Sequence, residues 1–152
     1  SELNKKSYRR FPDNITFNKE DGEGYISWVA SHNGYIKNYK KIITRKIKIL
    51  KNKNEIIGED SIISTKINTK KLVYHIRFHL MPKCNCILTN NKKNVILRIN
   101  NQSWLFKSNS LIAIEDSIFI NNENQIQQTK QIVITGYIQD RKKIENWVFT
   151  KS

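Results

Sequence analysis

The stretch Lys41–Leu50 reads KIITRKIKIL, and it decides the fold class of this sequence. Ile43, Ile47 and Ile49, with Arg45 among them, alternate with a mixed set of side chains at the intervening positions. Successive side chains of a strand point to opposite faces, so this alternation indicates a half-buried β-strand. Helical periodicity is nearly absent from the rest of the chain.

Similar runs lie on both sides of this stretch, and clusters of Asn, Gly, Asp and Lys separate them. β-branched and aromatic residues in short runs bounded by such clusters are typical of strands and turns. Asn33-Gly34 is a strong signal for a hairpin turn. The further predicted strands are Tyr25–Ser31, Glu55–Ser64, Leu72–Leu80, Cys86–Leu88, Val95–Ile99, Trp104–Lys107, Leu111–Ile114, Ser117–Ile120, Gln131–Tyr137 and Ile144–Phe149.

The chain has 152 residues, enough for one domain with a proper core. We therefore expect residues 1–152 to form a single all-β domain, an antiparallel β-sandwich of about ten to twelve short strands. The first seven or so residues and Asn121–Lys130 are expected to be weakly organised, the latter as a long exposed loop. No apolar run suits a membrane span or a signal peptide, which predicts a soluble chain with no membrane partner.

The formal net charge is +14, from 27 Lys and Arg against 13 Asp and Glu. A surface with this excess of positive charge attracts polyanions such as acidic polysaccharide or nucleic acid. Ile, Asn and Lys are abundant together, however, and many of the Lys residues can instead form a solvated face. Signatures of the common hydrolases, metalloproteases and nucleotide-binding proteins are absent from the sequence.

The strand predicted at Leu72–Leu80 places His75, Arg77 and His79 on one face, opposite a face of apolar side chains. Two imidazoles and a guanidinium in a row could bind a carboxylate or sulfate, since Arg offers a bidentate fork. We therefore take these three residues as candidates for substrate binding. The alternative is an outward polar face with satisfied hydrogen bonds.

His32 and Tyr35 are the catalytic candidates, because they lie close together where a strand gives way to a turn. A β-elimination on a uronate needs one group that takes the C5 proton and one that protonates the leaving oxygen. A structural, hydrogen-bonded histidine is the alternative for His32. Gly58-Glu59-Asp60 has adjacent carboxylates that face opposite sides of a strand, so it is interpreted as a structural turn.

Two cysteines, Cys84 and Cys86, are separated by one residue. On a strand their Cα atoms would be about 6.5 Å apart, near the upper limit for a disulfide. We expect both cysteines to be reduced, partly buried thiols. The minor alternative is a metal site in which the cysteine pair and His79 are the ligands. No metal site is predicted for this chain.

Six short segments of the sequence form a recognisable series. They are Ala30–Tyr35 (ASHNGY), Gly58–Asp60 (GED), Arg77–Pro82 (RFHLMP), Gln102–Phe106 (QSWLF), Ile114–Phe119 (IEDSIF) and Thr129–Ile134 (TKQIVI). In this order they resemble the C-terminal part of bacterial heparinase II/III-like proteins, where the usual forms look like ASHDGY, GED, RFHLHP, GWxF, LEESVY and TxQIVL. The resemblance extends from about Gly24 to Gly136, and the order and spacing of the motifs are its specific part.

The resemblance implies a β-sandwich that packs behind an N-terminal α/α toroid, the two together cleaving acidic polysaccharides by β-elimination. It makes this chain the C-terminal fragment of a longer bacterial protein, from the periplasm or the cytoplasm. The toroid would supply much of the cleft and the catalytic Tyr, so we expect this chain alone to be inactive. The alternative is a non-catalytic β module that binds polyanions, either carbohydrate or nucleic acid.

This sequence departs from the family pattern at two positions. Asn33 stands where the family usually has Asp, and Met81 stands where it has the second His of RFHLHP. Both departures remove a side chain that could ligate metal or transfer a proton. We therefore expect no cofactor in this fragment, while a divalent metal in the full-length protein stays open.

Overall fold

The computed structural model describes residues 12–66 and 71–152. These residues form eleven strands and one helical turn. The elements are β1 (Ile15–Gly22), β2 (Tyr25–His32), α1 (Ile36–Tyr39), β3 (Lys41–Leu50), β4 (Glu55–Ser64), β5 (Leu72–His79), β6 (Asn85–Leu88), β7 (Asn94–Ile99), β8 (Gln102–Ser108), β9 (Ile112–Ile120), β10 (Ile126–Ile138) and β11 (Lys142–Lys151).

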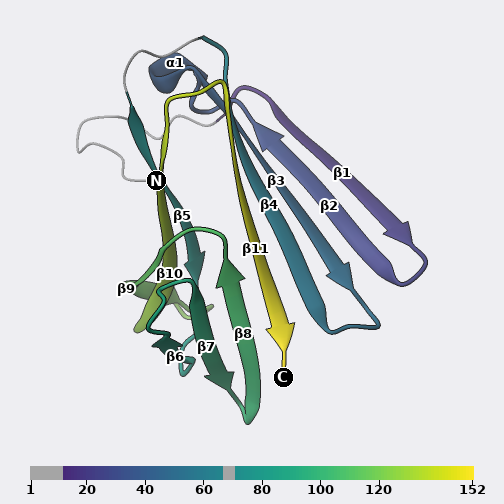
Figure 1. Ribbon diagram of the computed structural model, residues 1–152. Helices are drawn as coiled ribbons and strands as arrows, with labels where there is room; N and C mark the ends of the chain where they lie inside the picture. Colours follow the sequence, from purple (N-terminus) through teal and green to yellow (C-terminus); the bar gives the residue numbers. More distant parts are fainter. Residues whose placement is uncertain (1–11, 67–70) are drawn as a thin grey trace.

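The strands form two antiparallel sheets that pack face to face (Figure 1). The larger sheet has the order β1-β2-β3-β4-β11-β8-β7-β6, and the smaller has the order β5-β10-β9. β11 joins the two halves of the larger sheet, since it pairs with β4 on one side and β8 on the other. The predicted antiparallel β-sandwich is confirmed, and its strand count lies within the expected ten to twelve.

The hydrophobic core lies between the smaller sheet and the β4-β11-β8-β7 part of the larger one. Val95, Phe106 and Ile132 are fully buried there. Phe78 of β5 has its ring centroid 4.8 Å from that of Trp147 and 5.1 Å from that of Phe106. Aromatic contacts of this kind bury large apolar areas and stabilise the packing of the two sheets.

β2 and β3 form an antiparallel pair on either side of Asn33-Gly34, as predicted, but the connection between them is longer than a two-residue hairpin turn. The chain leaves β2 at His32 and makes the single helical turn α1, which ends where Lys40 adopts a left-handed φ of 56°. The tight turn of this region lies between β1 and β2 instead, where Gly24 has a φ of +77°. The sequence patterns did not predict β1, because seven of its eight residues are exposed and its apolar alternation stops after Phe17.

Three further predictions about boundaries need correction. Gly58-Glu59-Asp60 is not a turn but the middle of β4. Leu111–Ile114 and Ser117–Ile120 do not form two strands, because β9 runs without interruption from Ile112 to Ile120. The predicted loop Asn121–Lys130 is shorter, since β10 begins at Ile126. The prediction about the first seven or so residues lies outside the described residues.

Candidate functional site

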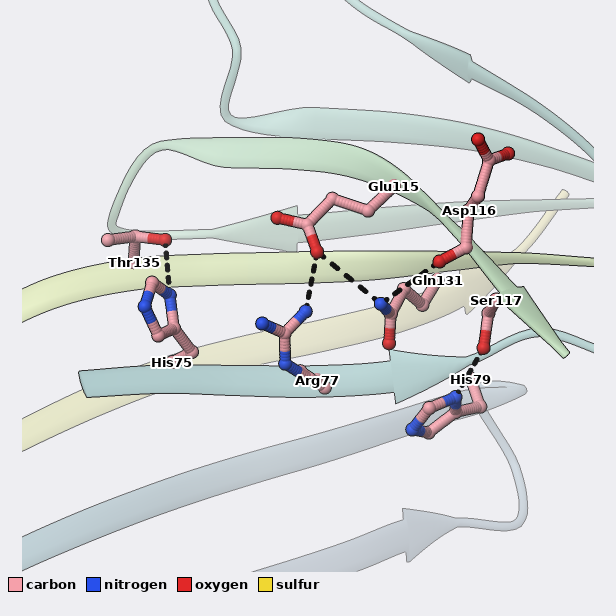
Figure 2. A network of polar contacts seen from close by, with 8 residues as sticks. All are labelled: His75, Arg77, His79, Glu115, Asp116, Ser117, Gln131 and Thr135. Carbon is pink, nitrogen blue, oxygen red and sulfur yellow. Dashed lines mark hydrogen bonds and ion pairs between the residues drawn. The ribbon is translucent and has the colours of Figure 1, made fainter. Parts of the chain in front are cut away.

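β5 presents His75, Arg77 and His79 on the outer face of the smaller sheet, as the alternation of its sequence predicts (Figure 2). The intervening residues face the core, where Ile76 is buried and Phe78 packs against the aromatic cluster. The two imidazoles and the guanidinium therefore do lie in one row along one strand. The hypothesis that this row binds substrate stays a prediction.

Each member of the row has a partner on another strand of the smaller sheet, β10 or β9, so the row is held in place by the chain itself. Such bonds fix the orientation of a side chain, and they also compete with a ligand for it. The three contacts are His75 Nδ1 to Thr135 Oγ1 at 2.9 Å, Arg77 Nη1 to Glu115 Oε2 at 2.5 Å and His79 Nδ1 to Ser117 Oγ at 2.8 Å.

Arg77 and Glu115 form an ion pair that crosses β10 from β5 to β9 (Figure 2). Val133, the neighbour of Arg77 on the intervening strand, is fully buried although it belongs to the outer face. Gln131 lies beside the pair, and its Nε2 donates to the Asp116 carbonyl at 3.2 Å. Its Oε1 is buried and has no hydrogen-bond partner among the described residues. The outer face therefore combines a half-exposed ion pair with one unsatisfied acceptor.

His32 is the last residue of β2 in the larger sheet, and Tyr35 lies just before α1, whereas the row lies on β5 of the smaller sheet. Their ring centroids are 5.5 Å apart, and Tyr39 continues the cluster at 6.1 Å from Tyr35. The Gly34 N–H donates to His32 Nδ1 at 3.3 Å. A neutral His32 ring then carries its proton on Nε2, since Nδ1 acts as the acceptor.

Burial lowers the pKa of His32 below the usual value for histidine. Loss of solvation disfavours the charged imidazolium, so the neutral ring predominates near pH 7. A neutral imidazole acts as a general base through its unprotonated nitrogen, which in His32 is Nδ1, the atom that accepts from the Gly34 N–H. The structure brings His32 and Tyr35 together at the end of β2 in the larger sheet, whereas the His75, Arg77 and His79 row lies on the smaller sheet.

A polar cluster that the sequence reasoning missed lies between the two sheets, around Asp60 and Glu145. These two residues are directly opposite each other on β4 and β11, and their exposed fractions are only 4% and 1%. Asp60 accepts from Arg45 Nε at 2.7 Å, from Arg45 Nη2 at 2.9 Å and from Trp147 Nε1 at 2.9 Å. The one sequence signal for this buried cluster was Arg45, which stands among the apolar residues of one face in Lys41–Leu50.

The GED segment has a structural role in this cluster. The Trp147 ring lies directly over Gly58, where an added Cβ would come within 2.0 Å of the ring. Only glycine leaves that space, and Asp60 then receives the indole N–H. The motif therefore seats and orients a core tryptophan.

Glu145 is the second buried carboxylate of the interior, and it also has several partners. The Tyr74 hydroxyl donates to Glu145, Ser110 Oγ donates to it at 2.7 Å, and Lys143 Nζ lies 3.3 Å away. Burial, followed by the hydrogen bond and charge of Glu145, raises the pKa of Tyr74 above its usual value. Tyr74 is thus held neutral as a donor, which suits a structural network.

The residues described here offer no group of three or more His, Cys, Asp or Glu that could hold a metal ion. Asn33 does not fit as a ligand, because its Oδ1 accepts from the Asn14 N–H at 3.0 Å. Cys84 and Cys86 are both free, partly buried thiols, as expected, and burial raises the pKa of each.

No helix among the described residues is both long and apolar enough to span a membrane.

Comparisons with known proteins agree with this architecture. A search of curated proteins found no match. Among solved structures, heparan sulfate lyase HepC from Pedobacter heparinus is similar with a TM-score of 0.71 and 10% identity over 90% of this chain. A heparinase III gene product has a TM-score of 0.70 and 8% identity over 92% of the chain, and a further heparinase III has 0.64 and 12% over 90%.

The chain spans only about a fifth of the length of these relatives: 21% of HepC, 24% of the heparinase III gene product and 21% of the further heparinase III. At such low identity these similarities show a shared fold. A family model described as "Heparinase II/III-like, C-terminal" matches residues 4–147, which is nearly the whole sequence. The chain therefore belongs to the heparinase II/III-like C-terminal domain family.

Proposed function

We propose that this chain is the C-terminal β-sandwich domain of a polysaccharide lyase that cleaves acidic, uronate-containing polysaccharides by β-elimination. The observation that carries the proposal is the family match across residues 4–147. The fold it shares with a heparan sulfate lyase supports the same substrate class. An N-terminal α/α toroid of the parent protein would supply the rest of the cleft.

In this scheme His32 is the group of the chain best suited to proton transfer. It is partly buried and has a lowered pKa, and proton uptake at its Nδ1 requires that the Gly34 N–H, which donates to it at 3.3 Å, be displaced. Tyr35 lies against it and can take part in the same proton relay. Arg77 is the group best suited to bind a substrate carboxylate or sulfate.

The test compares the 152-residue chain with the complete gene product, using absorbance of the unsaturated uronate product on heparin, heparan sulfate, alginate and hyaluronan. The chain alone should give no turnover, and the complete protein should cleave at least one substrate. Within the complete protein, His32→Ala should lower kcat by roughly 100-fold, the scale of general acid–base catalysis. Arg77→Ala should mainly raise KM. Absence of turnover by the complete protein on every uronate polymer would overturn the proposal.

A second candidate function is binding of polyanions without catalysis, which the net charge of +14 favours. Tyr39 and Tyr137 are exposed aromatic rings that could stack on sugars or bases, whereas Trp104 packs against the core. If this is the function, the chain should bind acidic polysaccharide and nucleic acid with similar affinity. Both affinities should fall steeply as the salt concentration rises. A clear preference for uronate polymers at physiological salt would instead favour the lyase domain.

A further inference from the structure

Cys84 and Cys86 occupy alternate positions at the start of the short edge strand β6, since Cys84 directly precedes the strand and Cys86 belongs to it. Both are half-buried and pack against the hydrophobic core, whereas Asn85 and Ile87, which alternate with them, are exposed. Side chains two positions apart on an extended segment point to the same side. The two thiols therefore face the core together.

The spacing of the two thiols suits a bound ion better than a disulfide. Both cysteines are free. Their Cα atoms, two positions apart on an extended segment, are about 6.5 Å apart, near the upper limit for a disulfide whose sulfurs must approach to about 2.05 Å. Two metal–sulfur bonds of about 2.3 Å in line separate the sulfurs by about 4.6 Å instead. Parallel side chains on one face of a strand can meet that separation with less distortion.

The surroundings of the two thiols also suit a metal ligand pair. Burial raises the pKa of both thiols, so both carry their protons near pH 7. A backbone hydrogen bond from Arg98 nevertheless favours the thiolate of Cys84, and the charge of Lys130 favours that of Cys86. Once an ion displaces the protons, each sulfur thus has a neighbouring group that stabilises its negative charge.

We propose that Cys84 and Cys86 form a binding site for a soft monovalent metal ion, Cu(I), held in line between the two sulfurs. Thiolates are the ligands that select Cu(I) over hard cations. Zn²⁺ fits less well, because it takes four ligands and the described part of the chain has no cluster of three or more His, Cys, Asp or Glu. His79 takes no part, since it lies on the outer face of the smaller sheet and its Nδ1 bonds to Ser117.

Binding breaks the two S–H bonds, forms two metal–sulfur bonds and releases both protons to solvent, with no change of oxidation state. The resulting complex has a net charge of about −1, which the ammonium group of Lys130 can offset. The site differs from the sequence-based expectation of no metal in this chain, because the structure places both thiols at the core. It does not depend on the proposed lyase activity, so either can fail alone.

The test is a titration of the reduced 152-residue chain with Cu(I), without oxygen and in competition with bicinchoninate. We expect one ion per chain and an ultraviolet thiolate-to-copper absorption that stops growing at that ratio. Because two protons leave, the association constant should rise by about a hundredfold per pH unit near neutral pH. A rise of only about tenfold per pH unit would overturn the proposal, since it would mean that a single thiol binds.

Cys84→Ala and Cys86→Ala should each weaken binding by more than about a hundredfold, because even the loss of an outer-shell partner costs about ten- to a hundredfold. Ile87→Ala is the matched control, since Ile87 belongs to the same strand but is 54% exposed, and its affinity should not change. If an alanine variant fails to fold, protection of both thiols of the unmodified chain from iodoacetamide by one equivalent of Cu(I) tests the same claim. Unchanged affinity in either cysteine variant, absence of that protection, or one ion shared by two chains would overturn the proposal.

Discussion

Both halves of the larger sheet contain strands of alternating sequence, but their surroundings are very different. In the covered half, β4, β11, β8 and β7, the inner residues Val95 and Phe106 are fully buried. In the uncovered half, β1 to β3, the inner residue Phe17 is 62% exposed. Period-2 alternation therefore reports which face of a strand is apolar, but it does not report whether a second layer covers that face.

The largest expected effect is a contrast between two phenylalanines, one in each half. Phe106→Ala should lower the free energy of unfolding by about 3 to 5 kcal/mol, because it leaves a cavity in a packed aromatic cluster. Phe17→Ala should cost less than about 1 kcal/mol in this chain, since the ring is mostly exposed. Urea unfolding followed by tryptophan fluorescence measures both. Similar losses would mean that Phe17 is buried in solution, and the comparison of the two halves would fail.

The boundary between the halves depends on Asp60, which connects Arg45 of β3 to Trp147 of β11. Asp60→Ala leaves the guanidinium and the indole N–H without their acceptor, so we expect a loss of about 2 to 4 kcal/mol. Asp60→Asn should cost less, because the amide oxygen can still accept one of these bonds. Thermal unfolding of both variants checks the order. An equal loss in both would show that charge pairing, and not hydrogen bonding, dominates at the boundary.

A smaller effect is expected in how the stability of the fold depends on pH, and it arises from a residue of the covered half. Burial raises the pKa of Tyr74 in the folded state, so its neutral form is favoured there. The resulting stabilisation is fully present below the unfolded pKa of about 10 and is lost as pH rises beyond it. Tyr74→Phe should therefore flatten the fall in stability above about pH 10.

The matched control is Tyr25→Phe, since Tyr25 also donates to a carboxylate, Glu20, but from the uncovered half. The pKa of Tyr25 is raised mainly by that hydrogen bond. Solvent weakens such a contact, so this variant should change the alkaline slope less. Denaturant midpoints measured from pH 8 to pH 11 would show the difference, and a larger change from Tyr25→Phe would contradict the assignment.

The sequence was sufficient to predict the fold class because alternation is a local property of each strand. β3 and β4 begin and end where the sequence predicts them. The failures arose where distant contacts decide the structure. β1 is polar and forms through pairing with β2, and Gly58 resembles a turn residue until Trp147 is known to lie over it.

The candidate site was likewise predicted from the sequence only in part. The alternation of β5 was enough to place Arg77 on an outward face, and this is confirmed. Its partner Glu115 is 38 residues away, on a strand two positions across the smaller sheet, so no local pattern could reveal the ion pair. The Asp60 and Glu145 cluster was missed for the same reason, since β4 and β11 meet only in the folded sheet.

The smallest expected effect concerns binding at the outer face of the covering sheet. Arg77 is 21% exposed and already paired with Glu115, so a uronate carboxylate must compete with an internal carboxylate. Arg77→Ala should weaken binding of a uronate oligosaccharide by about five- to tenfold, on the scale of a charge-assisted contact. Lys107→Ala is the control, because Lys107 is exposed on a strand of the larger sheet and should contribute only to the general field.

Glu115→Gln distinguishes a binding residue from a merely paired one. If Arg77 contacts the ligand, removing the competing charge should strengthen binding by a few-fold, since the guanidinium is then free to pair with the uronate. If Arg77 only holds β5 to β9, Glu115→Gln should lower thermal stability and leave affinity unchanged. Calorimetric titration at two salt concentrations separates these outcomes, because a site-specific contact persists at a salt concentration that screens a dispersed Lys field. Equal, small losses from Arg77→Ala and Lys107→Ala would show that the row of β5 is a solvated strand face.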